Sequence, residues 1–230
     1  IEALRLQAAV MANPEAGANE RALALSWFLH VLGDIHQPMH VTDYFSAEYP
    51  VGNAAGTLSY VWDPLQDSAI SLHILWDSNA IRSTALETVD RNAAAFVERY
   101  PRSSFPQLAS GGGAPDFEGW AREAHQIAVD FAYGSGLDFV SDPDKSMDSA
   151  QIVGKMVKYI LFGISPLDEA PAVPPQYWEE LQERARRQIT LAGYRMADVI
   201  IASADTLLAE RSLSGRILDA ADNVQQRADR

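Results

Sequence analysis

Four of the five histidines lie between residues 30 and 73, and two of them stand four residues before an aspartate. A spacing of four places both side chains on one face of a helix, so two helices can direct several ligands into one cavity. Mixed imidazole and carboxylate donors suit Zn²⁺ better than Ca²⁺ or Mg²⁺, which prefer oxygen ligands. We therefore predict a metal site built from His30, Asp34, His40, His73 and Asp77.

The charge distribution around these residues favours the same interpretation. Residues 22–81 contain six acidic side chains and neither lysine nor arginine. A cluster of acidic and imidazole side chains without lysine or arginine is energetically unfavourable unless a divalent cation binds among them. A solvated acidic loop is the alternative, and it accounts for Asp43, Glu48, Asp63 and Asp67 but not for the placement of the histidines.

An isolated histidine is more often a helix cap or a hydrogen-bonded core group than a metal ligand, and two histidines fit that description. His36 comes two residues after Asp34, so on a continuing helix it points away from the ligand face. His125 has no comparable neighbour. We predict structural roles for both.

The composition of the whole chain excludes several classes of protein. Against 31 Asp and Glu there are 18 Lys and Arg, a net charge of −13, which argues against binding nucleic acid through a basic face. Any phosphate ligand therefore needs another source of positive charge. The lack of cysteine excludes disulfides, thiolate zinc sites and thiol nucleophiles. No apolar run reaches the roughly 18 residues of a membrane span.

Helical periodicity dominates the chain. Apolar residues recur every four positions from Glu20 to Asp34, and this pattern predicts a helix that buries Leu23, Trp27, Val31 and Ile35. We expect a long loop over residues 41–69 with a short hairpin near residues 58–62. Further helices are predicted over residues 71–82, 83–99, 120–131, 152–160 and 176–207. The pattern indicates a mainly α, single-domain protein over residues 1–230, with 211–230 as a flexible tail.

The expected loop is rich in aromatic residues. It carries Tyr44, Phe45, Tyr49, Tyr60 and Trp62. Aromatic faces stack nucleobases without sequence preference, so Tyr44 and Tyr60 are candidate substrate contacts. Packing of these rings beneath the helices is an equal alternative for the group.

Several motifs together resemble one family. They are His30, the run Gly33-Asp34-Ile35-His36-Gln37-Pro38-Met39-His40, the pair Gly52-Asn53, and Leu72-His73-x2-Trp76-Asp77. This pattern, over roughly residues 20–203, resembles the S1/P1 nuclease family of zinc-dependent phosphodiesterases, which is related to bacterial zinc phospholipase C. The resemblance implies a helical bundle of the phospholipase C/P1 nuclease type, three zinc ions in a cleft, and endonuclease cleavage of single-stranded DNA or RNA to 5′-nucleotides. Some members also remove 3′-phosphates.

The resemblance also implies roles for individual residues. His40, His73 and Asp77 would hold one zinc ion. His30 and Asp34 would contribute to the other two, with Asp34 bridging, and Asn53 would stabilise the scissile phosphate in the transition state. Asp34 and Asn53 are therefore the candidate catalytic residues. Secretion or a periplasmic location is implied by the resemblance alone, and no stable protein partner is implied.

The upstream part of the family pattern is not found. Family members take further zinc ligands, including an N-terminal tryptophan, from upstream of the position that matches His30. Only 29 residues precede His30, and they contain neither histidine nor aspartate. The sequence thus predicts one complete zinc site in a chain that is N-terminally incomplete relative to the family. A phospholipase C-like phosphodiesterase and an inactive metal-binding fragment remain as alternatives.

Overall fold

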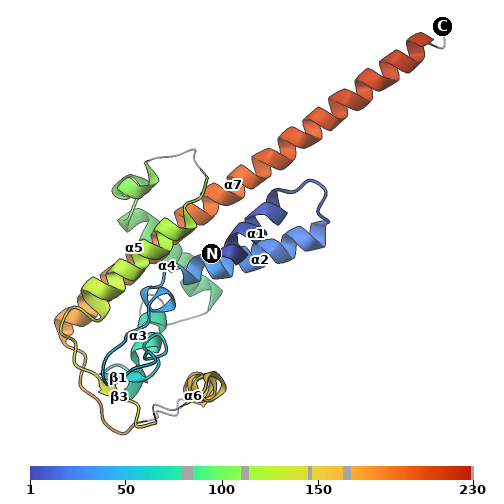
Figure 1. Ribbon diagram of the computed structural model, residues 1–230. Helices are drawn as coiled ribbons and strands as arrows, with labels where there is room; N and C mark the ends of the chain where they lie inside the picture. Colours follow the sequence, from blue (N-terminus) through green and yellow to red (C-terminus); the bar gives the residue numbers. More distant parts are fainter. Residues whose placement is uncertain (79–84, 110–113, 145–146, 163–166, 229–230) are drawn as a thin grey trace. The chain divides into compact units, whose positions relative to one another are not determined.

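The computed structural model describes residues 1–78, 85–109, 114–144, 147–162 and 167–228, and helices dominate them (Figure 1). The predicted mainly α class is confirmed. Two compact units are present, residues 1–32 with 193–230 (unit 1) and residues 33–192 (unit 2). The longer helices are α1 (Glu2–Ala12), α2 (Ala18–Asp34), α3 (Leu72–Ser78), α4 (Leu86–Arg99), α5 (Phe117–Ile127), α6 (Ser149–Phe162) and α7 (Pro175–Ala228). The helical turns are η1 (Pro38–Val41), η2 (Arg102–Ser104), η3 (Pro106–Leu108) and the π-helical η4 (Ala128–Ala132).

The predicted helices are found, but the buried face predicted for α2 is wrong at Leu23 and Trp27, whereas Ile35, directly after α2, is buried as predicted. The buried residues of α2 are Ala24, Phe28 and Leu32, whereas Leu23 is 61% exposed and Trp27 is 53% exposed. Two stripes of apolar residues run side by side along this helix, each with a spacing of four. Periodicity alone therefore could not decide which of them is buried. The boundary between the helices predicted over residues 71–82 and 83–99 lies outside the described part of the chain.

A small antiparallel sheet in unit 2 leads into α3. Its strands are β1 (Ser59–Asp63), β2 (Ser68–Ser71) and β3 (Val140–Ser141), in the order β2-β1-β3. The predicted hairpin is confirmed and continues to Ser71, which pairs with Tyr60. Ser71 also caps α3, because its Oγ accepts a hydrogen bond from the amide of Ile74 at 3.2 Å. The sheet thereby fixes where α3 begins.

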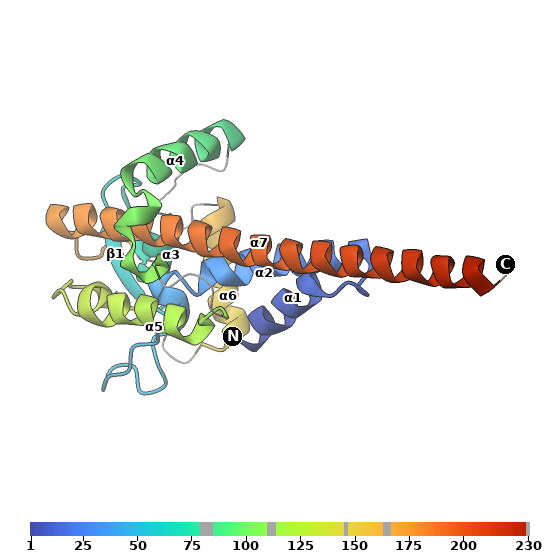
Figure 2. The ribbon, with the colours of Figure 1, turned by 90° about the horizontal axis from the view of Figure 1, so that it is seen from above.

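The first turns of α7 form the apolar support for α3. Trp76 of α3 donates its indole hydrogen to the hydroxyl of Tyr177 at 3.3 Å. The ring of Tyr177 stacks on Phe131 of η4, with centroids 4.6 Å apart, and Leu181 is fully buried in the same cluster. Figure 2 shows α4 and α5 on different sides of this part of α7. This packing holds α3 against rigid neighbours.

An ion pair between a partly exposed lysine and a buried carboxylate connects α6 to the sheet. The carboxylate of Asp142 is fully buried and accepts hydrogen bonds from Lys155 of α6 at 2.7 and 2.8 Å. The hydroxyl of Tyr60 donates to the same carboxylate at 3.1 Å. Removal of one partner from such a pair leaves a buried charge without compensation, so these three residues constrain the sheet strongly.

None of the described helices combines the length and the apolarity that a membrane crossing requires.

Candidate metal centre

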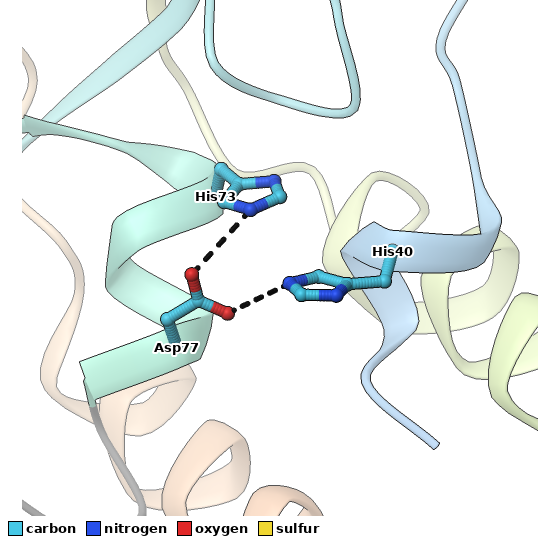
Figure 3. Close-up of side chains that lie close together, drawn as sticks. All are labelled: His40, His73 and Asp77. Carbon is cyan, nitrogen blue, oxygen red and sulfur yellow. Dashed lines mark hydrogen bonds and ion pairs between the residues drawn. The ribbon is translucent and has the colours of Figure 1, made fainter. Parts of the chain in front are cut away.

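Two histidines and one aspartate from separate elements of unit 2 converge in the structure (Figure 3). His40 comes from η1, and His73 and Asp77 come from α3. His40 Nε2 lies 3.1 Å from Asp77 Oδ1, and His73 Nε2 lies 3.4 Å from Asp77 Oδ2. The two imidazole rings are stacked, with centroids 4.8 Å apart and planes at 14°. These are the three residues predicted to hold one complete zinc site.

The donor set and its spacing fit a zinc ion. Bonds of about 2.0–2.1 Å to a tetrahedral zinc place its donor atoms roughly 3.3 Å apart. One donor atom from each of the three side chains lies within 4.8 Å of the others, so small rotamer changes suffice to enclose the ion. Three protein ligands leave one coordination position open, which is the arrangement of catalytic zinc sites. The Asp77 side chain is 40% exposed, so the centre is accessible from solvent.

The pKa values of His40 and Asp77 are shifted by their surroundings. Burial disfavours the charged form of His40, but its hydrogen bonds and charge interactions with Asp77 and Asp34 outweigh that effect and raise its pKa above 6.5. Burial would raise the pKa of Asp77, yet the hydrogen bond from His40 and the charge of His73 lower it. Protonation of His40 therefore competes with metal binding, because a metal ion needs the neutral imidazole.

We expect a rise in pH to lower the stability of the metal-free protein and to raise its affinity for zinc. Because the pKa of His40 is raised by folding, its contribution to stability is complete below pH 6.5 and is lost as pH rises through the folded-state value. Zinc binding needs neutral imidazole, so zinc affinity rises over the same interval. Chemical denaturation of the metal-free protein and zinc titration, each on both sides of pH 6.5, measure the two trends. The variant His40→Gln should lose the stability trend, and the same trend in that variant would contradict the assignment.

Each histidine of the centre is also held through its second ring nitrogen. His73 Nδ1 lies 3.0 Å from the carbonyl oxygen of Ala55, which can only accept, so Nδ1 carries a hydrogen and Nε2 is the ring nitrogen that faces Asp77. His40 Nδ1 lies 3.2 Å from Asp34 Oδ1. Asp34 is therefore placed as a hydrogen-bond partner of His40. Its predicted role as a bridging zinc ligand stays a prediction.

Asn53 lies at the centre of the loop that precedes β1, and it is fully buried. Its Oδ1 accepts hydrogen bonds from the amides of Tyr44 at 3.2 Å and Gly56 at 3.0 Å. Its Nδ2 donates to Ser59 Oγ at 2.9 Å and to the hydroxyl of Tyr133 at 3.0 Å. Burial raises the pKa of Tyr133 to about 12. The side chain of Asn53 thus organises the loop, and its predicted contact with the scissile phosphate stays a prediction.

Asp43 and Gly52 complete the organisation of this loop. Asp43 Oδ1 accepts hydrogen bonds from the amides of Tyr44 at 3.0 Å and Ala55 at 3.2 Å. Gly52 has a φ of +92°, and a Cβ there would collide with the Asp43 carboxylate. Only glycine allows this close approach without strain. The loop is therefore fixed at the point where Ala55 meets His73.

The aromatic residues of the loop do not all face solvent. Tyr60 is 3% exposed and bound to Asp142, so its buried ring does not support the predicted substrate contact. Burial, with the charge of Asp142, also raises the pKa of Tyr60. Tyr44 is half-buried and stacks on Tyr133, with centroids 4.9 Å apart. Phe45, in contrast, is 63% exposed.

The other histidines lie apart from this cluster or in unit 1. His36 is 2% exposed, with its ring 5.9 Å from that of Trp120, and this burial suits a structural role. His125 Nδ1 lies 3.1 Å from the carbonyl oxygen of Val41, so it links α5 to the end of η1. His30 is an exposed residue of α2 in unit 1, edge-on to Trp27 at 6.2 Å. Its role as a zinc ligand stays a prediction.

Two groups at the centre were not expected from the sequence. The first is the Ala55 carbonyl, for which a sequence has no signature because every residue carries one. The second is the side chain of Gln37, which donates to Asp77 Oδ1 at 2.7 Å. Its position directly before Pro38 is typical of a residue that caps a helical turn, and that signal could have drawn attention to it.

Comparison with known proteins agrees with the motifs. The family model for S1/P1 nuclease matches residues 1–205. Neither a curated protein nor a solved structure matches the chain. The match extends over most of the chain and includes every residue of the cluster in Figure 3. The chain belongs to the S1/P1 nuclease family.

Proposed function

We propose that this protein is a zinc-dependent nuclease that hydrolyses phosphodiester bonds in single-stranded DNA or RNA. Membership of the family implies a hydrolase that acts on phosphodiester bonds. The observation that carries the finer proposal is the convergence of His40, His73 and Asp77, with their donor atoms within 4.8 Å and one coordination position left open.

The residues of the centre have separable tasks. A zinc ion held there would supply positive charge to a phosphoryl oxygen and activate a water molecule as the nucleophile. Asp77 balances part of that charge, while the Ala55 carbonyl fixes the tautomer of His73. Asp34 orients the ring of His40 in the same way. The protein itself carries a net charge of −13, so the metal is the source of positive charge that a phosphate needs.

Nucleic acid is favoured over a lipid headgroup by the loop before β1. Its backbone is held at Tyr44 by both Asp43 and Asn53, and at Ala55 by contact with His73. Phe45, next to this anchor, presents an exposed ring on a fixed backbone. An exposed aromatic face on the loop that contacts His73 suits a stacked base.

The direct test compares three substrates with zinc-loaded and chelator-treated protein. We expect cleavage of single-stranded DNA and RNA oligonucleotides to 5′-nucleotides by the zinc-loaded form, with little turnover of a choline phospholipid. Preferential turnover of the phospholipid would instead favour the phospholipase C-like alternative. Release of phosphate from a 3′-nucleotide tests the associated 3′-nucleotidase activity. If the zinc-loaded protein leaves every substrate intact, the inactive metal-binding fragment is the correct interpretation.

Removal of the exposed ring at position 45 should weaken substrate binding. Stacking of one base on an aromatic side chain contributes about 1–3 kcal/mol, so Phe45→Ala should raise KM for an oligonucleotide roughly 5- to 160-fold. Its folding stability should change little, because the ring is 63% exposed. Steady-state kinetics with Phe45→Trp as a rescue and Leu65→Ala, another exposed apolar residue, as a control measure this. An equal KM in Phe45→Ala and the control would exclude the stacking role.

The proposal also includes zinc sites beyond the one formed by His40, His73 and Asp77. Family members bind up to three zinc ions, and His30 and Asp34 are the candidates for the further sites in this chain. Metal analysis of the wild type and of His30→Ala counts the ions directly. A secreted or periplasmic location is proposed from family membership alone.

A further inference from the structure

The side chain of Gln37 contacts both elements that carry the metal-binding residues. Its Nε2 donates to Asp77 Oδ1 at 2.7 Å, across 40 residues of sequence. Its Oε1 accepts a hydrogen bond from the amide of Met39, at the start of η1. The next residue along η1 is His40. One amide group therefore joins the turn that carries His40 to the helix that carries Asp77.

The two contacts define the orientation of the amide. The backbone N–H of Met39 can only donate, so the atom facing it must be the oxygen. The ionised carboxylate of Asp77 can only accept, so the atom facing it must be the nitrogen. The flipped amide would place two donors together and two acceptors together, which is unfavourable at both ends.

With this contact, each of the three residues of the centre has a hydrogen-bond partner that is not itself part of the centre. His73 is held by the carbonyl of Ala55 at 3.0 Å, and His40 by Asp34 at 3.2 Å. Asp77 has a carboxylate with about four lone-pair positions, and Gln37 occupies one of them and leaves the others for the metal. Such outer partners fix ligand orientation, and their loss typically weakens metal binding about 10- to 100-fold.

Met39 anchors the other end of the contact. Its side chain is fully buried in the apolar cluster of unit 2, so η1 has little freedom to move. A rigid turn connected to Asp77 by a charge-assisted hydrogen bond holds that carboxylate in place before any metal arrives.

We propose that Gln37 is the positioning residue of the metal centre, and that zinc affinity and coordination geometry depend on its amide. This rests on the proposed zinc site, but it concerns the assembly of the site rather than the reaction.

The test replaces Gln37 in two ways. Gln37→Met keeps an unbranched side chain and removes both hydrogen bonds. Gln37→Glu keeps an oxygen to accept from Met39 but removes the donor to Asp77. The matched control is Gln126→Met, because Gln126 on α5 also donates to an aspartate, Asp130, at 2.7 Å, outside the His40, His73 and Asp77 cluster.

The readouts are the zinc dissociation constant from chelator competition, the visible spectrum of the cobalt-loaded protein, and the melting temperature of the metal-free protein. We expect both Gln37 variants to bind zinc about 10- to 100-fold more weakly than wild type and to alter the cobalt spectrum. Gln126→Met should do neither, and all three variants should keep a cooperative melt without metal.

Two results would overturn the proposal. One is a wild-type zinc affinity and cobalt spectrum in both variants. The other is normal zinc affinity in Gln37→Glu together with a loss in Gln37→Met, which would assign the effect to capping of η1. A failure of the proposed nuclease function looks different, since zinc would then bind with the expected dependence on Gln37 while single-stranded substrates remain intact.

Discussion

The variant Asp77→Asn is expected to lose high-affinity zinc binding, with a dissociation constant more than about 100-fold above that of wild type. Loss of an outer partner alone costs about 10- to 100-fold, and removal of a ligand's charge must cost more. Asp77 is the only acidic member of the three-residue cluster and lies against both of its imidazoles. Nuclease activity should fall with the bound metal, because no other group in the cluster can replace the carboxylate.

The measurement combines metal analysis after dialysis with hydrolysis of a single-stranded oligonucleotide. Asp138→Asn removes an exposed carboxylate elsewhere in unit 2 and serves as the matched control. It should retain wild-type zinc content. Full zinc occupancy and activity in Asp77→Asn would refute the assignment of this cluster as the metal centre.

Part of the centre could be predicted because its geometry is local. A histidine and an aspartate four residues apart must share a helix face, and His73 and Asp77 do so on α3. The approach of His40 is different, since it lies 37 residues before Asp77. Nothing in residue spacing shows that η1 and α3 meet. The assignment of His40, His73 and Asp77 to one zinc ion came from the resemblance to the family.

Burial of individual residues was the least predictable feature. Tyr60 was proposed to contact substrate, yet its place on the central strand of the sheet turns its ring inward toward Asp142. Phe45, which was not singled out, is the exposed aromatic. Composition of a loop shows that rings are available, but the register of a strand decides which ones are buried.

The structure also reduces the number of acidic residues that support a metal site. Asp63, which a solvated acidic loop was thought to explain, is fully buried and accepts a hydrogen bond from the amide of Leu65 at 2.8 Å. Asp43 likewise accepts from backbone amides. Asp34 and Asp77 each form an ion pair with His40. The case for a metal therefore depends on these two aspartates and not on the six acids of the segment.

Substitution of Asn53 is the second change for which we expect a large effect, here on stability and zinc affinity. Family resemblance assigns this residue to the phosphate, whereas the hydrogen bonds described for its side chain lie within the protein. Asn53→Ala leaves buried groups without partners, and each such group costs about 1–3 kcal/mol. We expect a loss of about 2–4 kcal/mol in the free energy of unfolding. Zinc affinity should fall as well, because Ala55, in the same turn, holds His73.

Chemical denaturation of the metal-free protein separates the two roles of Asn53. A residue that only contacts substrate would leave the free energy of unfolding unchanged and lower the rate of hydrolysis. A residue that organises the loop lowers stability and zinc affinity together, even without substrate. Asn13→Ala is the control, since Asn13 is exposed and accepts one backbone hydrogen bond, from Glu15 at 3.0 Å. Equal stability of the Asn53 and Asn13 variants would favour the phosphate contact, whereas a much larger loss for Asn53→Ala would show that its side chain supports the metal centre through the loop.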